Sequence, residues 1–152
     1  MTIWVDADSC PVRVRSIVAK AAGERKIRSV FVANRKIPIE ALNPYVKSVL
    51  VGKSEGSADA YISEKAGAGD LAITRDIPLA AALVGKGITA INDRGDVFTS
   101  ETVGERLSLR NFMKDLREAG LYESPSGTFG QREVRLFSNS FDRELTRLNR
   151  AK

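Results

Sequence analysis

The sequence predicts an α/β fold, namely a three-layer α/β/α sandwich with a mostly parallel sheet and additional C-terminal helices. Short β-rich runs alternate with helix-like segments along the first two thirds of the chain, an order typical of parallel sheets covered by helices. The β-rich runs are continuously apolar, as expected for strands buried on both faces. With 152 residues, 43% of them hydrophobic, the chain can form one core, so we expect a single domain over residues 1–152.

The chain opens with a predicted strand, turn and helix. Residues 3–5 form an apolar, β-prone run that is followed by a polar turn. Pro11 then lies where the first turn of a helix tolerates proline. Residues 12–25 carry apolar side chains at helical spacing, which predicts a helix with one buried face.

Four more strands are predicted in the middle of the chain, over residues 29–34, 46–51, 71–74 and 88–91. Ser57 is a candidate N-cap for a helix that runs to Ala66 and is ended by the glycines that follow it. A second helix follows the Arg-Asp-Ile-Pro junction at residues 75–78. These helices provide the crossover connections that parallel strands need.

Two helices are predicted in the last third, over residues 103–119 and 131–148. A Ser-Pro-Ser-Gly loop at residues 124–127 separates them. Phe137 and Phe141 are four residues apart in the second helix, so we expect both to lie on its buried face.

The composition excludes several kinds of chemistry. The chain has no histidine, which rules out Ser–His and Cys–His nucleophile pairs and imidazole metal ligands. Cys10 is the only cysteine, so no intrachain disulfide can form, and we expect this thiol to be packed rather than reactive. No apolar stretch is long enough to cross a membrane and no signal-peptide pattern is present. We therefore expect a cytoplasmic protein without a membrane partner.

Four aspartates are candidate catalytic residues. Asp6 and Asp8 follow the first strand, Asp76 follows a later one, and Asp59 lies in the first turn of a helix. Parallel strands end at a common edge of the sheet, and ligands bind there. Carboxylate oxygens suit Mg²⁺ or Mn²⁺, which can activate water for phosphodiester hydrolysis without histidine. Taken singly, each aspartate is also explained as a helix cap or as a partner of a helix dipole.

Two further aspartates have simpler explanations. Asp70 precedes its strand, which places it at the opposite edge of the sheet, and it fits a turn. Asp93 lies in an Asn-Asp-Arg-Gly segment at residues 92–95 that has the composition of a turn, although it could also contact a metal at the edge where the strands end. Arg94 in this segment can reach the same edge as the four aspartates, and it is a candidate phosphate contact.

Basic residues are concentrated near the C-terminus. Residues 131–152 carry six lysines or arginines against three acidic residues, so this segment accounts for +3 of the net charge of +5. Such a segment is typical of proteins that contact a polyanion, although charge alone is equally compatible with a solvated surface. The candidate RNA-binding residues are Arg94, Arg132, Arg135, Arg143 and Arg147.

The sequence resembles the bacterial YaiI/YqxD family over essentially its whole length. The resemblance is carried by Ile-Trp-Val-Asp-Ala-Asp-Ser-Cys-Pro-Val at residues 3–12, by Gly-Asp-Leu-Ala-Ile-Thr-Arg-Asp-Ile-Pro-Leu-Ala at residues 69–80, and by Arg-Asn-Phe-Met at residues 110–113. That family is grouped by similarity with PIN-like domains, a nuclease fold in which acidic residues hold a divalent metal for RNA cleavage.

The resemblance has consequences for individual residues. It implies metal ligation by Asp6, Asp59 and Asp76, with Asp8 as an auxiliary acid, in agreement with the grouping made from strand ends. Asp93 departs from the family pattern, which usually has proline at that position.

Three functions remain open at this point. The first is a Mg²⁺- or Mn²⁺-dependent ribonuclease that uses the four aspartates. The second is an RNA-binding module that keeps the fold without catalysis. The third is a phosphatase, because Asp6-x-Asp8 also resembles the nucleophile motif of haloacid-dehalogenase-like enzymes, although Ser9-Cys10-Pro11 departs from the Gly-Thr continuation usual there. The sequence predicts no oligomeric state.

Overall fold

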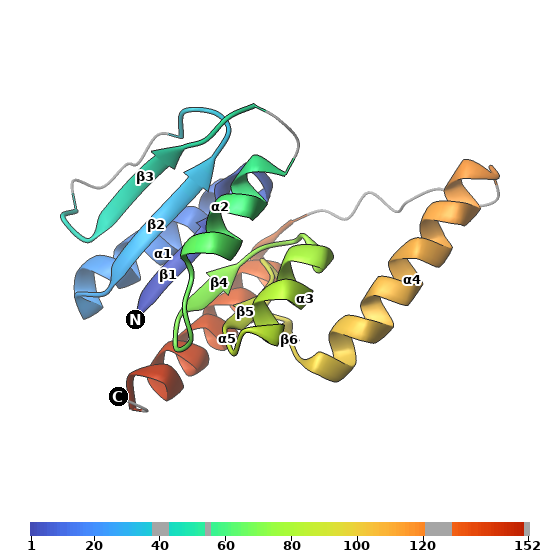
Figure 1. The fold of residues 1–152 in the computed structure, drawn as a ribbon. Coiled ribbons are helices and arrows are strands. Elements are labelled where there is room, and N and C mark those ends of the chain that lie inside the picture. The colour runs from blue at the N-terminus through green and yellow to red at the C-terminus, as the bar shows by residue number, and fades with distance from the viewer. Residues whose placement is uncertain (38–42, 54–55, 121–128, 151–152) are drawn as a thin grey trace.

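The computed structural model describes residues 1–37, 43–53, 56–120 and 129–150 (Figure 1). It contains one six-stranded sheet with strands in the order β3-β2-β1-β4-β5-β6. The strands are β1 (Thr2–Asp6), β2 (Arg28–Ala33), β3 (Val46–Leu50), β4 (Leu71–Ile73), β5 (Thr89–Ile91) and β6 (Val97–Phe98). The helices are the short 3₁₀ helix η1 (Ala7–Ser9), α1 (Val12–Arg25), α2 (Ser57–Lys65), α3 (Ile77–Gly85), α4 (Ser100–Glu118) and α5 (Gln131–Arg150).

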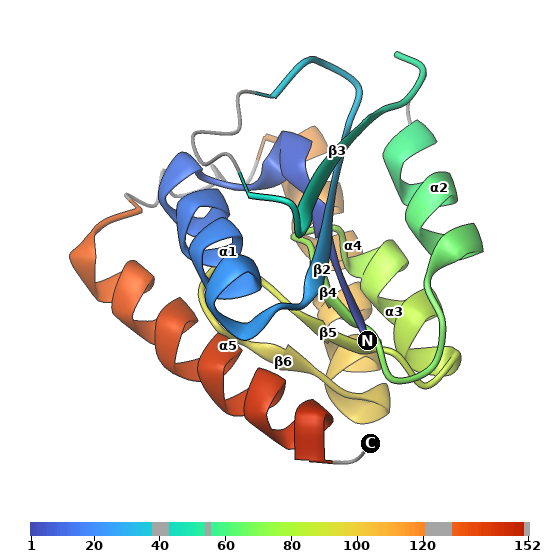
Figure 2. The same ribbon diagram turned by 90° about the vertical axis from the view of Figure 1, so that its left-hand side faces the viewer.

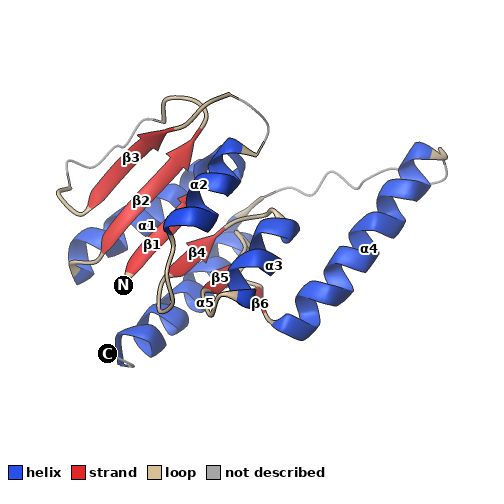
Figure 3. Ribbon diagram, in the orientation of Figure 1, coloured by secondary structure: helices blue, strands red, loops and turns tan. Residues whose placement is uncertain are grey.

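The strand order creates a switch point between β1 and β4. From β1 the chain builds the sheet outward through β2 and β3, then returns to add β4 and β5 on the other side of β1, all in parallel. Figure 3 shows the helices that connect β1 to β2, β3 to β4 and β4 to β5. Helical connections leave a switch point in opposite directions, which opens a crevice at the carboxyl ends of the two central strands. The end of β1 and the end of β4 are therefore the expected position of a site.

The helices form two layers, and alternate residues of each strand face alternate layers. Ile3 and Val5 of β1 pack into the apolar cluster that contains α1 and α5. Trp4, between them, packs into a second cluster with residues of α2 and α3. Figure 2 shows α1 and α5 side by side on one face of the sheet and α2 and α3 on the other. The three-layer α/β/α arrangement predicted from the sequence is confirmed.

Helices α4 and α5 differ in how they pack against the three-layer sandwich. Phe137 and Phe141 of α5 are buried as predicted, and their rings stack with centroids 5.2 Å apart. Helix α4 begins with a capping box between Thr99 and Thr102. Its first turns pack beside α3, while its far end extends away from the sheet (Figure 1).

The sequence prediction missed one strand and assigned one helix cap to the wrong residue. Strand β6 is antiparallel to β5 and was not predicted, because two residues are too short to give a periodic signal. The prediction that Ser57 is the N-cap of α2 was wrong. Gly56 occupies that position with a left-handed φ of 81°, a conformation that a serine adopts only at a steric cost. The predicted loop at residues 124–127 lies outside the described residues.

Asp70 secures the amino-terminal edge of the sheet. Its Oδ1 accepts a hydrogen bond from the backbone N–H of Thr2, and its Oδ2 accepts bonds from the Trp4 indole and the Gly67 backbone, each at 2.9 Å. The expectation that Asp70 serves a turn away from the candidate site is confirmed.

None of the described helices is sufficiently long and apolar to traverse a bilayer.

Candidate functional site

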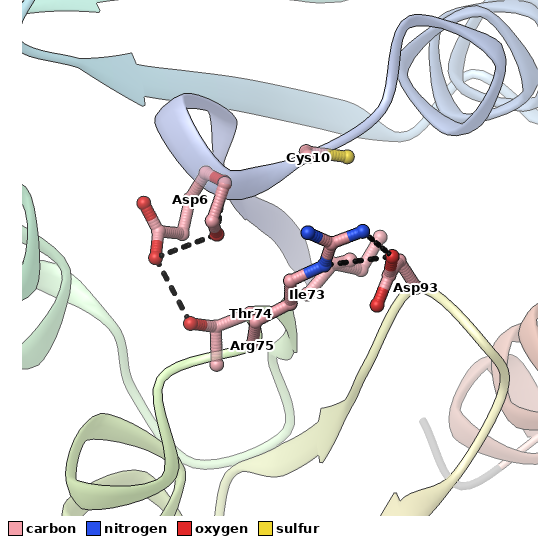
Figure 4. A pocket seen from close by; sticks show the side chains of 7 residues that line it. Asp6, Cys10, Ile73, Thr74, Arg75 and Asp93 are labelled. Atoms are coloured by element: carbon pink, nitrogen blue, oxygen red, sulfur yellow. Dashed lines mark hydrogen bonds and ion pairs between the residues drawn. The ribbon is translucent and has the colours of Figure 1, made fainter. Parts of the chain in front are cut away.

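Asp6 is the last residue of β1 and lies at the switch point. The register pairs Val5 with Ile73 of β4, so the next residue of each strand, Asp6 and Thr74, face one another. The Thr74 hydroxyl donates a hydrogen bond to Asp6 Oδ2 at 3.0 Å. The Ser9 hydroxyl of the following 3₁₀ turn donates to the same oxygen at 3.2 Å (Figure 4). Two hydroxyls from different elements therefore fix the orientation of this carboxylate.

Burial perturbs the ionisation of Asp6. The residue is only 6% exposed, and loss of hydration raises the pKa of its carboxyl group. The hydrogen bonds from Thr74 and Ser9 oppose this effect, while the negative charges of Asp76 and Asp8 add to it. A buried carboxylate surrounded by other carboxylates is the electrostatic setting that a cation relieves.

Asp59 and Asp76 come to the same edge from two helices. Asp76 caps α3, with its Oδ1 accepting a hydrogen bond from the backbone N–H of Leu79 at 2.9 Å. Burial, a hydrogen bond with Asp76 and the charges of Asp76 and Asp6 together raise the pKa of Asp59 to about 7. A hydrogen bond between two carboxyl groups requires that one of them holds a proton. Asp76 is therefore both a helix cap and a member of a cluster with Asp6 and Asp59. These three aspartates are called the acidic group below.

Asp8 has a different environment. Its Oδ2 accepts a hydrogen bond from the backbone N–H of Asn34 at 2.8 Å, and its Oδ1 lies 3.6 Å from Arg35 Nε. These contacts tie the turn after β1 to the end of β2. The carboxylate still contributes negative charge at Asp6.

A small pocket extends from Asp6 toward the end of β5. It is lined by Asp6, Ser9, Cys10, Ile73, Thr74, Arg75 and Asp93. Arg75 and the buried Asp93 form an ion pair in which Arg75 Nε donates to Asp93 Oδ2 at 2.8 Å and Nη2 donates to the same oxygen (Figure 4). Cys10 is buried, and burial is the main cause that raises the pKa of its thiol to about 12. A buried thiol with a raised pKa agrees with the expectation that Cys10 is packed rather than reactive.

Comparison with known proteins places the chain in a family. A model of the family described as "Uncharacterized BCR, YaiI/YqxD family" matches residues 4–147. The chain belongs to the YaiI/YqxD family. It is 49% identical to a UPF0178 protein of Myxococcus xanthus over 97% of this chain and 96% of the relative. It is 50% identical to a UPF0178 protein of Treponema pallidum over 99% of this chain and 84% of the relative. No solved structure matches the chain.

In this YaiI/YqxD protein the candidate aspartates are brought together from separate elements. At the carboxyl end of β1 and β4, the charge of Asp76 contributes to the raised pKa of both Asp6 and Asp59, and the charge of Asp8 contributes to that of Asp6. Among the described residues, no three side chains of metal-ligating types converge closely enough to hold an ion as they stand. Binding of a metal by all three carboxylates therefore requires side-chain rotation.

The candidate arginines of this YaiI/YqxD protein lie at two ends of the molecule. Arg13, at the start of α1, donates to Gln131 at 2.7 Å, and Arg94 lies 3.7 Å from Glu133, so α5 begins near the site. Arg132 and Arg135 are exposed on this first part of α5. Arg147, near the other end, donates to Thr89 at the start of β5, and Arg143 is one turn earlier.

Gly95 explains how α5 approaches the site. It has a left-handed φ of 86°, and a Cβ at this position would lie 2.4 Å from the carbonyl oxygen of Leu136. Only glycine allows the turn after β5 to pack so closely on the helix backbone.

Thr74, Ser9 and Arg75 were not predicted as site residues. The available signal was that Thr74 and Arg75 are the first polar residues after the apolar run of β4, as Asp6 is after the apolar run of residues 3–5.

The raised pKa of Asp59 has a consequence for stability. Between its ordinary value of 3.8 and about 7, the folded YaiI/YqxD protein binds more protons than the unfolded chain, so stability falls as pH rises through this window. We expect the Tm of the metal-free protein to decrease from pH 5 to pH 8, and the decrease to be smaller in Asp59→Asn. Thermal unfolding in EDTA, with the exposed Asp115→Asn as control, measures this. An unchanged pH dependence in Asp59→Asn would contradict the assignment.

Proposed function

We propose that this protein is a ribonuclease that depends on a divalent metal, Mg²⁺ or Mn²⁺. The observation that carries the proposal is the meeting of Asp6, Asp59 and Asp76, from three separate elements, at the switch point of a parallel sheet. Strongly perturbed carboxyl groups at the carboxyl ends of strands are typical of functional sites. The absence of histidine from the sequence leaves oxygen ligands and carboxyl groups to carry the chemistry.

The donor set fits such a metal. Mg²⁺ and Mn²⁺ prefer carboxylate and water oxygens and keep several waters when bound. Asp6, Asp59 and Asp76 would hold the ion, whose positive charge would offset the repulsion among their carboxylates. When bound, the metal supplies an activated water and positive charge that stabilises the transition state of phosphodiester hydrolysis.

The protein's own groups provide orientation and proton exchange. Thr74 and Ser9 hold Asp6 through its Oδ2. The carboxyl of Asp59, whose pKa is raised to about 7, is suited to gain or lose a proton near neutral pH. Asp8 acts as an auxiliary acid that anchors the β1 turn through Asn34 and Arg35. The backbone N–H of Asn34 occupies Oδ2 of Asp8, whereas Oδ1 accepts no hydrogen bond from the described residues.

RNA is the proposed substrate because of the basic surface next to the site. Arg94, Arg132 and Arg135 lie near the start of α5, on the side of the molecule where the strands end. Exposed arginines there can follow a phosphate backbone toward the acidic group. Arg143 and Arg147 would extend the contact along α5, which has 20 residues.

The test is a Mn²⁺ titration by calorimetry, followed on the same sample by incubation with a mixed RNA pool. We expect Mn²⁺ to bind and RNA fragments to accumulate with Mn²⁺ but not with EDTA. RNA binding without Mn²⁺ binding would leave the non-catalytic RNA-binding module as the function. Absence of Mn²⁺ binding to the folded protein would reject the metal-dependent nuclease. In a separate assay, hydrolysis of an aryl phosphate would favour the phosphatase.

A further inference from the structure

Arg75 is fixed beside the acidic group by a buried counterion. The side chain of Asp93 is 4% exposed and that of Arg75 is 48% exposed. A buried carboxylate is strongly destabilising without a partner, so Asp93 holds the guanidinium at this position. The backbone places Arg75 one residue after Thr74, which donates its hydroxyl hydrogen bond to Asp6. The ion pair and Asp6 therefore line one pocket.

The ion pair leaves part of the guanidinium available. Nε and Nη2 both donate to Asp93 Oδ2, while Nη1 makes no hydrogen bond with the described residues. Figure 4 shows the guanidinium between Asp6 and Asp93, so its free side is turned toward the acidic end of the pocket. An arginine whose position is fixed and whose remaining donors are free is well suited to bind a phosphate oxygen.

A second cation lies on the Cys10 side of the pocket. Arg15 of α1 is close enough to Cys10 to lower the pKa of its thiol, as is Arg75. Arg15 Nε and Nη1 are buried and have no hydrogen-bond partner in the described part of the chain. Arg15 is not among the residues that line the pocket, but its positive charge near Cys10 adds to that of Arg75.

We propose that Arg75, positioned by Asp93, donates a hydrogen bond from Nη1 to a phosphate oxygen of an RNA strand bound at the acidic site. This inference rests on the proposed function in taking RNA as the ligand. It adds a contact that none of the candidate arginines on α5 supplies, because this guanidinium lies within the pocket that Asp6 lines. Asp93 is a positioning residue that acts through Arg75.

The experiment measures binding of a fluorescein-labelled single-stranded RNA by fluorescence anisotropy in EDTA, where metal-dependent cleavage cannot occur. We expect Arg75→Gln to raise the Kd at least tenfold, in line with the loss of a charge-assisted hydrogen bond to phosphate. Arg75→Lys, which keeps the charge but not the planar fork, should give an intermediate Kd. Arg110→Gln, an exposed arginine of α4, should change the Kd less than twofold.

A double variant separates binding from folding. Arg75→Gln alone leaves Asp93 buried and unpaired, which destabilises the protein. Arg75→Gln with Asp93→Asn removes both charges, so we expect this variant to fold and still to bind RNA at least tenfold more weakly. RNA affinity equal to wild type in the folded double variant, or no RNA binding by wild type, would overturn the inference.

A Mn²⁺ titration and the RNA cleavage assay on the same variants distinguish this inference from the proposed function. Weakened RNA binding with unchanged Mn²⁺ affinity supports Arg75 as a phosphate contact. If wild type does not cleave RNA but the double variant binds it more weakly, the nuclease proposal fails and the Arg75 contact stands. If wild type cleaves RNA and the double variant binds and cleaves it equally well, the nuclease stands and the Arg75 contact is rejected.

Discussion

Replacing Asp6 with asparagine is expected to lower the rate of Mn²⁺-dependent RNA cleavage about 10³-fold while the protein remains folded. The substitution keeps the size of the side chain and an oxygen that can accept the hydrogen bonds from Thr74 and Ser9. It removes the negative charge at the centre of the acidic group. A 10³-fold loss corresponds to about 4 kcal/mol of transition-state stabilisation, a reasonable share for a carboxylate that positions a catalytic metal.

The cleavage rate is measured at saturating RNA with Mn²⁺ varied, which separates weaker metal binding from slower chemistry. Asp115→Asn on α4 provides the same chemical change at an exposed position outside the site, and it should cleave at the wild-type rate. Thermal unfolding of Asp6→Asn should show a Tm equal to or above that of wild type without metal, because a buried charge has been removed. Full activity in a folded Asp6→Asn protein is incompatible with the proposed metal site.

Phe137→Ala is expected to reduce the free energy of unfolding by about 3–5 kcal/mol, the usual cost of removing a buried aromatic ring. The side chain is 0% exposed. It stacks on Phe141 and lies in the cluster that joins α5 to α1 and to the sheet. The substitution leaves a cavity between α5 and the rest of this layer and also removes the ring stacking.

Urea denaturation measures the loss. Leu136→Ala is the matched control, because this neighbouring residue of α5 is 46% exposed and should lose at most about 1 kcal/mol, since little of its apolar surface is removed from water. Equal losses at the two positions would show that α5 does not pack against the sheet through its phenylalanine face.

The sequence was informative where the hydrophobic pattern was long and regular. Helix α1 has the predicted bounds, and the two phenylalanines of α5 lie on the buried face that their spacing predicted. The strand ends were also predictable, because a polar residue that follows a buried apolar run marks the edge of a sheet. The grouping of Asp6, Asp59 and Asp76 followed from this rule and from the family resemblance.

Other features depend on contacts that a sequence pattern does not encode. The ion pair of Arg75 with Asp93 joins residues at the ends of adjacent strands, and its existence depends on the order of strands in the sheet. Asp93 fits a turn from its neighbours alone, so its burial was not predictable. Strand β6 is too short to carry a pattern of its own, and it forms because the turn at residues 92–95 brings it back against β5.

The strand order also affects when the site can form during synthesis. β1 is a central strand whose second neighbour, β4, is made only after α1, β2, β3 and α2. A nascent chain that ends before residue 71 exposes one edge of β1 and contains Asp6 without Asp76. Pairing of strands so far apart in sequence is a late and slow folding event. Partly synthesised or truncated chains are therefore expected to lack the complete acidic group, so any activity that depends on it would be confined to chains with a finished sheet.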